Sequence, residues 1–91
     1  MEVEIGRVTH FYSHLCVAVL QLKEPLKLGD KIHIRGHTTD FVQRVNSIEI
    51  EHRPAVWVKP GDDAAIKVIA PVREHDIVYR VVEESVEPHL A

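Results

Sequence analysis

The stretch Leu26–Gly36, which reads LKLGDKIHIRG, decides the fold. Gly29 and Asp30 predict a tight turn, because glycine adopts unusual backbone angles freely and a following aspartate accepts backbone amide hydrogen bonds. The residues after this turn alternate strictly between polar and apolar, which is typical of a half-buried β-strand. The pattern places Ile32 and Ile34 in a core and their neighbours on an outer face.

A second turn of the same kind lies in Lys59–Ile66, which reads KPGDDAAI. Proline followed by glycine suits a type II turn, so Gly61 and Asp62 have the same expected structural role as the first pair. A strand over Ala64–Ala70 follows this turn.

The remaining chain also favours strands, because Val and Ile recur in short segments without a helical period. Val45 and Ile48 cannot share one face of a single strand, so we expect a bulge near Asn46–Ser47. Leu15–Leu22 is dense in apolar residues and indicates a strand buried on both faces. The expected strands are Val3–Thr9, Leu15–Leu22, Lys31–Arg35, Phe41–Glu51, Ala64–Ala70 and Asp76–Val82.

This pattern predicts an all-β fold, a small closed antiparallel β-barrel of about six strands. Closure is expected because it removes exposed strand edges. Residues 1–82 form the barrel in this interpretation, and residues 83–91 form an acidic C-terminal tail. The 91-residue chain carries a net charge of −3, but five of its 14 acidic residues lie near the two ends. Between Arg7 and Arg80, nine acidic residues face 11 basic ones, so the body is slightly basic.

Several classes of function are excluded or disfavoured. The longest apolar run, Leu15–Leu20, is too short to cross a membrane. No phosphate-binding loop motif is present, so GTP binding is not expected. Cys16 is the only cysteine and lies in an apolar run, which predicts a buried, inert thiol and a cytoplasmic location. No serine, cysteine or acidic pair has a catalytic context, so we predict that the chain is not an enzyme.

The two Gly-Asp turns, with the Gly6-Arg7-Val8 segment before them, resemble the second domain of translational GTPases such as elongation factor Tu and initiation factor 2. The chain also resembles the C-terminal barrel of some collagenase-like, peptidase-family proteins associated with RNA modification. Thr39–Gln43 and Val72–Tyr79 look closest to that subgroup. Both resemblances imply a translation-protein type of barrel, and an association with RNA or ribonucleoprotein follows from them as an expectation.

Candidate binding residues lie on one predicted face and near the tryptophan. Lys31, His33 and Arg35 share the outer face of one strand, Arg44 lies on the strand expected beside it, and together these residues could hold a phosphate backbone. A solvated, charged strand face is the competing interpretation. Trp57 either stacks on a base beside Arg53 or fills one end of the barrel, and filling the barrel is favoured.

The chain has seven histidines, including pairs four residues apart at His10 and His14 and at His33 and His37. In a strand this spacing separates two side chains by about 13 Å. No metal site or other cofactor is therefore predicted.

The sequence favours a non-catalytic binding module that contacts tRNA or rRNA. One alternative is a module that docks on a larger enzyme or GTPase, or that pairs as a homodimer through an exposed edge strand. A small metal-binding protein built on the histidines is the second alternative.

Overall fold

A computed structural model describes residues 1–82, and the predicted acidic tail lies outside the described residues. The described part is all-β, with ten strands and no helix, so the all-β prediction is confirmed. The strands are β1 (Glu2–Tyr12), β2 (Val17–Leu22), β3 (Leu26–Lys27), β4 (Lys31–Arg35), β5 (Asp40–Arg44), β6 (Ile48–Ile50), β7 (Arg53–Pro54), β8 (Trp57–Val58), β9 (Asp63–Lys67) and β10 (Ile77–Val81). Within these residues, no helix is long and apolar enough to span a membrane.

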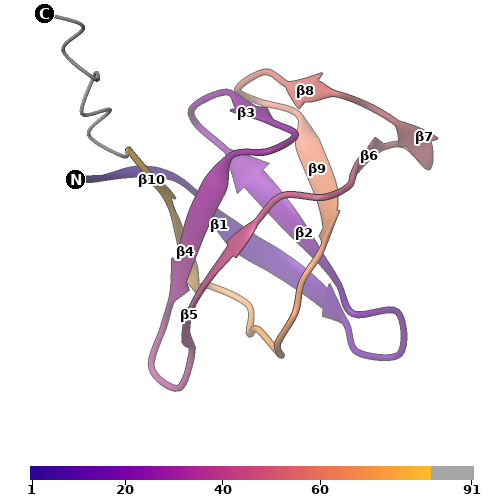
Figure 1. Cartoon of the computed structure of the whole chain (residues 1–91). Coiled ribbons are helices and arrows are strands. Elements are labelled where there is room, and N and C mark those ends of the chain that lie inside the picture. Colours follow the sequence, from indigo (N-terminus) through magenta and orange to yellow (C-terminus); the bar gives the residue numbers. More distant parts are fainter. Residues whose placement is uncertain (83–91) are drawn as a thin grey trace, which may run out of the picture.

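Eight strands form one antiparallel sheet in the order β5-β4-β10-β1-β2-β9-β6-β7, and β3 pairs with β8 in a small second sheet. The long strand β1 lies between β10 and β2 (Figure 1). Its ladder with β10 begins at Glu2 and Val81, next to a hydrogen bond from the Val82 amide to the Met1 carbonyl at 2.8 Å. The ends of the described chain therefore lie side by side.

The sheet is not closed by a hydrogen-bonded ladder between its two edges, so the prediction of a closed barrel of about six strands is wrong in both respects. The sequence pattern predicts one bulged strand over Phe41–Glu51. This segment instead contains two strands: β5 pairs with β4 at one edge, and β6 pairs with β9 and β7 near the other. Val45 and Ile48 are both buried because the chain changes partners between them, and no bulge is needed.

The side chain of Gln43 connects β5 to the end of β9 and to the residues that follow it. Its amide nitrogen donates to the Lys67 carbonyl at 2.9 Å, and its amide oxygen accepts from the Ile69 amide at 2.9 Å. Gln43 is 7% exposed, and a buried amide requires such partners. We call this contact the seam. The Gln43 side chain therefore joins the edge strand β5 to β9, which is not its neighbour in the sheet.

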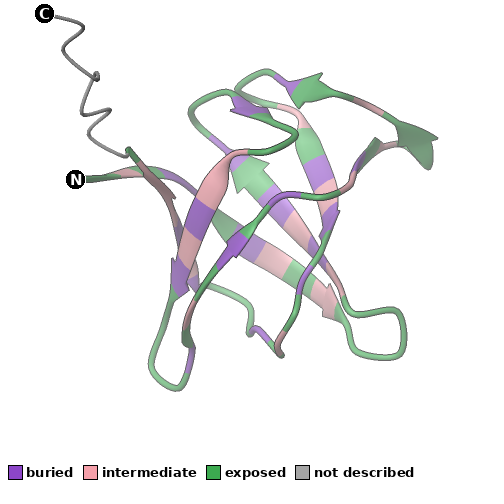
Figure 2. Cartoon of the chain, viewed as in Figure 1, coloured by how far each residue is buried: buried purple, intermediate pink, exposed green. Residues whose placement is uncertain are grey.

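The core lies on the inner face of the large sheet. Ile32 and Ile34 are fully buried, as their alternation predicts, and burial alternates along most strands (Figure 2). Other fully buried residues come from the central strands β1, β2, β9 and β10: Ile5, Val8, Ala18, Leu20, Ala64, Ile66 and Val78.

Glycine is required at close approaches and at turns. The ladder between β1 and β10 is irregular at Ile5, and a Cβ on the adjacent Gly6 would lie 2.3 Å from the Gln21 carbonyl oxygen. Gly29 and Gly61 have φ values of +88° and +93°, which glycine adopts without strain. Asp30 accepts a hydrogen bond from the Lys27 amide at 3.0 Å, which secures the first turn.

Two hairpin turns place other residues at positive φ. The predicted strand Leu15–Leu22 begins only at Val17, because the preceding residues form a turn in which Cys16 has a φ of 54°. Cys16 is exposed there, so the prediction of a buried thiol is wrong. The turn between β6 and β7 holds Glu51 and His52 at φ values of 50° and 64°, the backbone of a type I′ hairpin.

Candidate functional site

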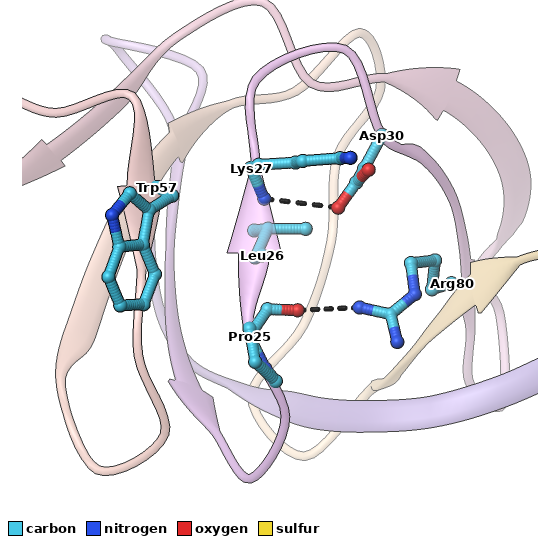
Figure 3. A pocket seen from close by; sticks show the side chains of 6 residues that line it. All are labelled: Pro25, Leu26, Lys27, Asp30, Trp57 and Arg80. Atoms are coloured by element: carbon cyan, nitrogen blue, oxygen red, sulfur yellow. Dashed lines mark hydrogen bonds between the residues drawn. The ribbon is translucent and has the colours of Figure 1, made fainter.

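The candidate site is a pocket of about 380 Å³ lined by Pro25, Leu26, Lys27, Asp30, Trp57 and Arg80 (Figure 3). We call it the tryptophan pocket. In the small sheet, Leu26 pairs with Val58 and Lys27 pairs with Trp57. The first pair is buried and the second is exposed, since alternate residues of a strand face opposite sides.

Trp57 is 55% exposed, so the expectation that it fills the barrel is wrong. Its flanking valines indicated burial, but Val58 alone packs into the core, and Val56 is exposed. The indole is held on the outer face by the register of β3 and β8. A large exposed ring beside a pocket is available to stack on a planar ligand.

Charged groups surround the indole. The guanidinium of Arg80 donates from Nη1 to the Pro25 carbonyl at 2.6 Å, which orients it at the pocket (Figure 3). The backbone of Lys27 is tied to the Asp30 carboxylate, which fixes the turn that borders the pocket. Two cationic side chains and one carboxylate therefore line the same cavity as the tryptophan.

Two further cations lie beside this turn. Lys31 and Arg44 are opposite each other in the ladder between β4 and β5. Arg44 donates from Nη1 to the Gly29 carbonyl at 3.1 Å, so its guanidinium lies over the same turn. Two more cationic side chains therefore border the turn that lines the tryptophan pocket.

His33 lies at the centre of the predicted basic face but is engaged by two carboxylates. Its Nδ1 contacts the Glu2 carboxylate at 2.7 Å, and its Nε2 contacts the Asp40 carboxylate. Hydrogen bonds to Asp40 and then to Glu2 raise the pKa of His33 above its usual value of 6.5. The bond to His33 lowers the pKa of Asp40. The three groups form a local ion cluster that links β1, β4 and β5.

The structure brings some of the predicted residues together and separates others. Trp57, Lys31 and Arg44 lie around the turn between β3 and β4. Arg35 lies at the far end of β4, opposite Asp40, and Arg53 lies on the hairpin of β6 and β7. The binding roles of all these residues stay predictions.

Sequence reasoning missed Lys27 and Arg80. The β3–β8 pairing that sets Lys27 opposite Trp57 joins residues 30 positions apart, and Arg80 reaches Pro25 from 55 positions away. A usable signal was present for the tryptophan, because adjacent residues of a strand face opposite sides, so Trp57 and Val58 cannot both enter the core.

One histidine of each four-residue pair contacts acidic side chains. His33 contacts carboxylates through both ring nitrogens. His10 lies 3.6 Å from Glu74, and its ring is tilted by 59° against that of Tyr12, with ring centroids 4.3 Å apart. Among residues 1–82, no three histidine, cysteine or acidic side chains are grouped closely enough to hold a metal ion.

Comparisons with solved structures find the same fold in a C-terminal domain of another protein. The C-terminal domain of a putative U32 peptidase from Geobacillus thermoleovorans superposes with a TM-score of 0.82, at 18% identity, over 88% of this chain and 93% of that domain. Its selenomethionine variant gives a TM-score of 0.79, at 19% identity, over 82% of this chain and 95% of that chain. At these low identities, the TM-scores show a shared fold.

A protein of Methanocaldococcus jannaschii named as an uncharacterized protease is 41% identical over 83 residues. The match covers 90% of this chain and 20% of that protein, so the chain spans about a fifth of the length of this curated relative. No family model matches the sequence.

These findings support the resemblance to the collagenase-like peptidase family and do not confirm the resemblance to elongation factor Tu. They also contradict the prediction that the chain is not an enzyme, because the proteins it resembles are named as a protease and a peptidase. The chain is similar to the C-terminal domain of a U32 peptidase.

Proposed function

We propose that this chain is a binding domain of a U32 peptidase-like enzyme, and that its tryptophan pocket holds single-stranded RNA. The single observation that carries the proposal is the exposed indole of Trp57 beside a pocket lined by Lys27 and Arg80. Every nucleobase has a π-face, so an exposed aromatic ring flanked by cations binds single strands with little sequence preference.

The arrangement of charge supports the same ligand. Lys31 and Arg44 extend the positive potential from the pocket along the edge of β4 and β5. A base stacked on Trp57 would leave its phosphates facing these cations, which is how proteins position a nucleic-acid backbone. The net charge of −3 argues against indiscriminate coating of nucleic acid, so the proposal is confined to one local site.

Trp57 is the only tryptophan of the chain, so its fluorescence reports directly on the pocket. Titration with a single-stranded oligoribonucleotide at low salt should quench this emission, and a duplex of the same sequence should quench it less. Binding by Trp57→Ala, followed through the anisotropy of labelled RNA, should weaken about 10- to 100-fold, because stacking contributes about 1–3 kcal/mol per base.

Neutralising Lys31 and Arg44 together, as Lys31→Gln and Arg44→Gln, should make binding less sensitive to salt. Each lost phosphate contact reduces the slope of log K against log salt by about 0.7 for a single strand. Lys67→Gln, which removes one exposed cation from β9, is the matched control. Unchanged RNA affinity in Trp57→Ala, or no quenching at low salt, would contradict the proposal.

A further inference from the structure

The outer face of the large sheet carries a second hollow of about 400 Å³, distinct from the tryptophan pocket. Its floor consists of Val17, Val19 and Ala65, which are outward-facing residues of β2 and β9. Tyr12 and Leu15 form one wall and are 49% and 64% exposed. We call this feature the acidic groove because of its opposite wall.

That opposite wall is charged. Glu49, Glu51 and Asp63 line the groove, together with His52. No lysine or arginine is among the described residues that line it, and Lys67 lies beyond one end, opposite Val17 in the ladder. The groove therefore combines a half-buried apolar floor with a rim that carries three carboxylates, on a chain whose body is slightly basic.

The turn that carries part of this rim adopts a costly backbone. Glu51 and His52 have positive φ values, a conformation that favours asparagine and glycine. The turn thus places a carboxylate and an imidazole at the groove, although a pair of smaller residues would complete the same hairpin with less strain. Strain of this kind is often found beside binding surfaces.

We propose that the acidic groove docks a segment of a partner protein that carries apolar side chains flanked by lysine or arginine. Charge complementarity decides the occupant, because a basic segment satisfies the three carboxylates while its apolar side chains cover Tyr12, Leu15 and the valine floor. An acidic ligand such as RNA would be repelled at this surface, so the groove and the tryptophan pocket serve different ligands.

The test uses two labelled peptides, one alternating leucine with lysine and its twin alternating leucine with glutamate. Fluorescence anisotropy should show saturable binding of the lysine peptide to the intact chain and none of its twin. Glu49→Lys combined with Glu51→Lys should weaken binding at least about tenfold, because both reversals face the basic segment. Val19→Ser, which makes the floor polar without entering the core, should also weaken it.

Two controls separate this proposal from general charge effects and from RNA binding. Glu24→Lys reverses an exposed carboxylate outside the groove and should change the affinity less than about twofold. Trp57→Ala should leave peptide binding unchanged even if it abolishes RNA binding. Far-UV circular dichroism verifies that each variant is folded.

Equal binding of the two peptides, or an equal effect of Glu24→Lys and the groove reversals, would overturn the proposal. A stable dimer in sedimentation that dissociates on the groove reversals would also overturn it, because the occupant would then be a second copy of the chain.

Discussion

Replacing Gln43 tests whether one side chain holds the seam between β5 and the end of β9. Gln43→Met keeps the length of the side chain but removes the donor to the Lys67 carbonyl and the acceptor from the Ile69 amide. Each net hydrogen bond contributes about 1 kcal/mol, and the two backbone partners belong to exposed residues, so the penalty for an unsatisfied buried group does not apply to them. We therefore expect a loss of about 2 kcal/mol in the free energy of unfolding.

That loss is large against a total stability of about 5–15 kcal/mol for a domain. In a domain of this size it lowers the melting temperature by roughly 8–16 °C. Urea unfolding followed by far-UV circular dichroism measures the free energy, and an unchanged m-value indicates that the same surface is exposed. Hydrogen exchange at the Ile69 amide should accelerate in the variant, because this amide loses its acceptor.

Gln21→Met is the matched control. Gln21 lies on β2, and its side-chain oxygen accepts only an exposed hydrogen bond from Arg7 Nε at 3.2 Å. Its replacement should change the stability by less than about 0.5 kcal/mol. If the two variants lose the same stability, the seam does not depend on Gln43 and the reasoning is refuted.

Two further predictions concern stability. Because the pKa of His33 is raised, the protonated imidazole stabilises the fold below pH 6.5, and this contribution is lost as the pH rises through the raised pKa. Because the pKa of Asp40 is lowered, its carboxylate stabilises the fold above pH 3.8, and this contribution is lost as the pH falls through the lowered pKa. The melting temperature of the wild type should therefore fall relative to that of His33→Gln as the pH rises above 6.5, and parallel curves would disprove the linkage. His52→Gly should stabilise the protein by about 0.5–1 kcal/mol in urea unfolding, because glycine adopts the positive φ without strain. No gain would show that the hairpin turn is unstrained.

Local geometry could be predicted from the sequence wherever neighbouring residues determine it. Alternation placed Ile32 and Ile34 in the core, and Gly29 and Gly61 have the positive φ that their turns require. The same reasoning failed where the chain changes partners. The spacing of Val45 and Ile48 indicates a change of face, but a bulge and a switch to another edge of the sheet give the same pattern.

The candidate site was only partly accessible to sequence reasoning. Trp57 was recognised as either a stacking ring or a core residue, and its pairing with Lys27 in a two-residue strand decides the outcome. Arg80 joins the pocket because β10 lies beside β4 in the sheet, a neighbour relation that depends on the order of all strands. Pairings across long sequence separations carry no local signal, so these two cations emerge only from the assembled fold.

The side-by-side ends of β1 and β10 also determine how the domain responds to force. Backbone hydrogen bonds of an antiparallel pair run perpendicular to the strands. The ladder ends with Glu2 opposite Val81, so tension applied at residues 1 and 82 pulls along those bonds and opens them one after another. Tension applied at opposite ends of the same pair would shear all of its bonds together. The domain is therefore mechanically compliant when pulled by these two ends and much stiffer when pulled along its central strands.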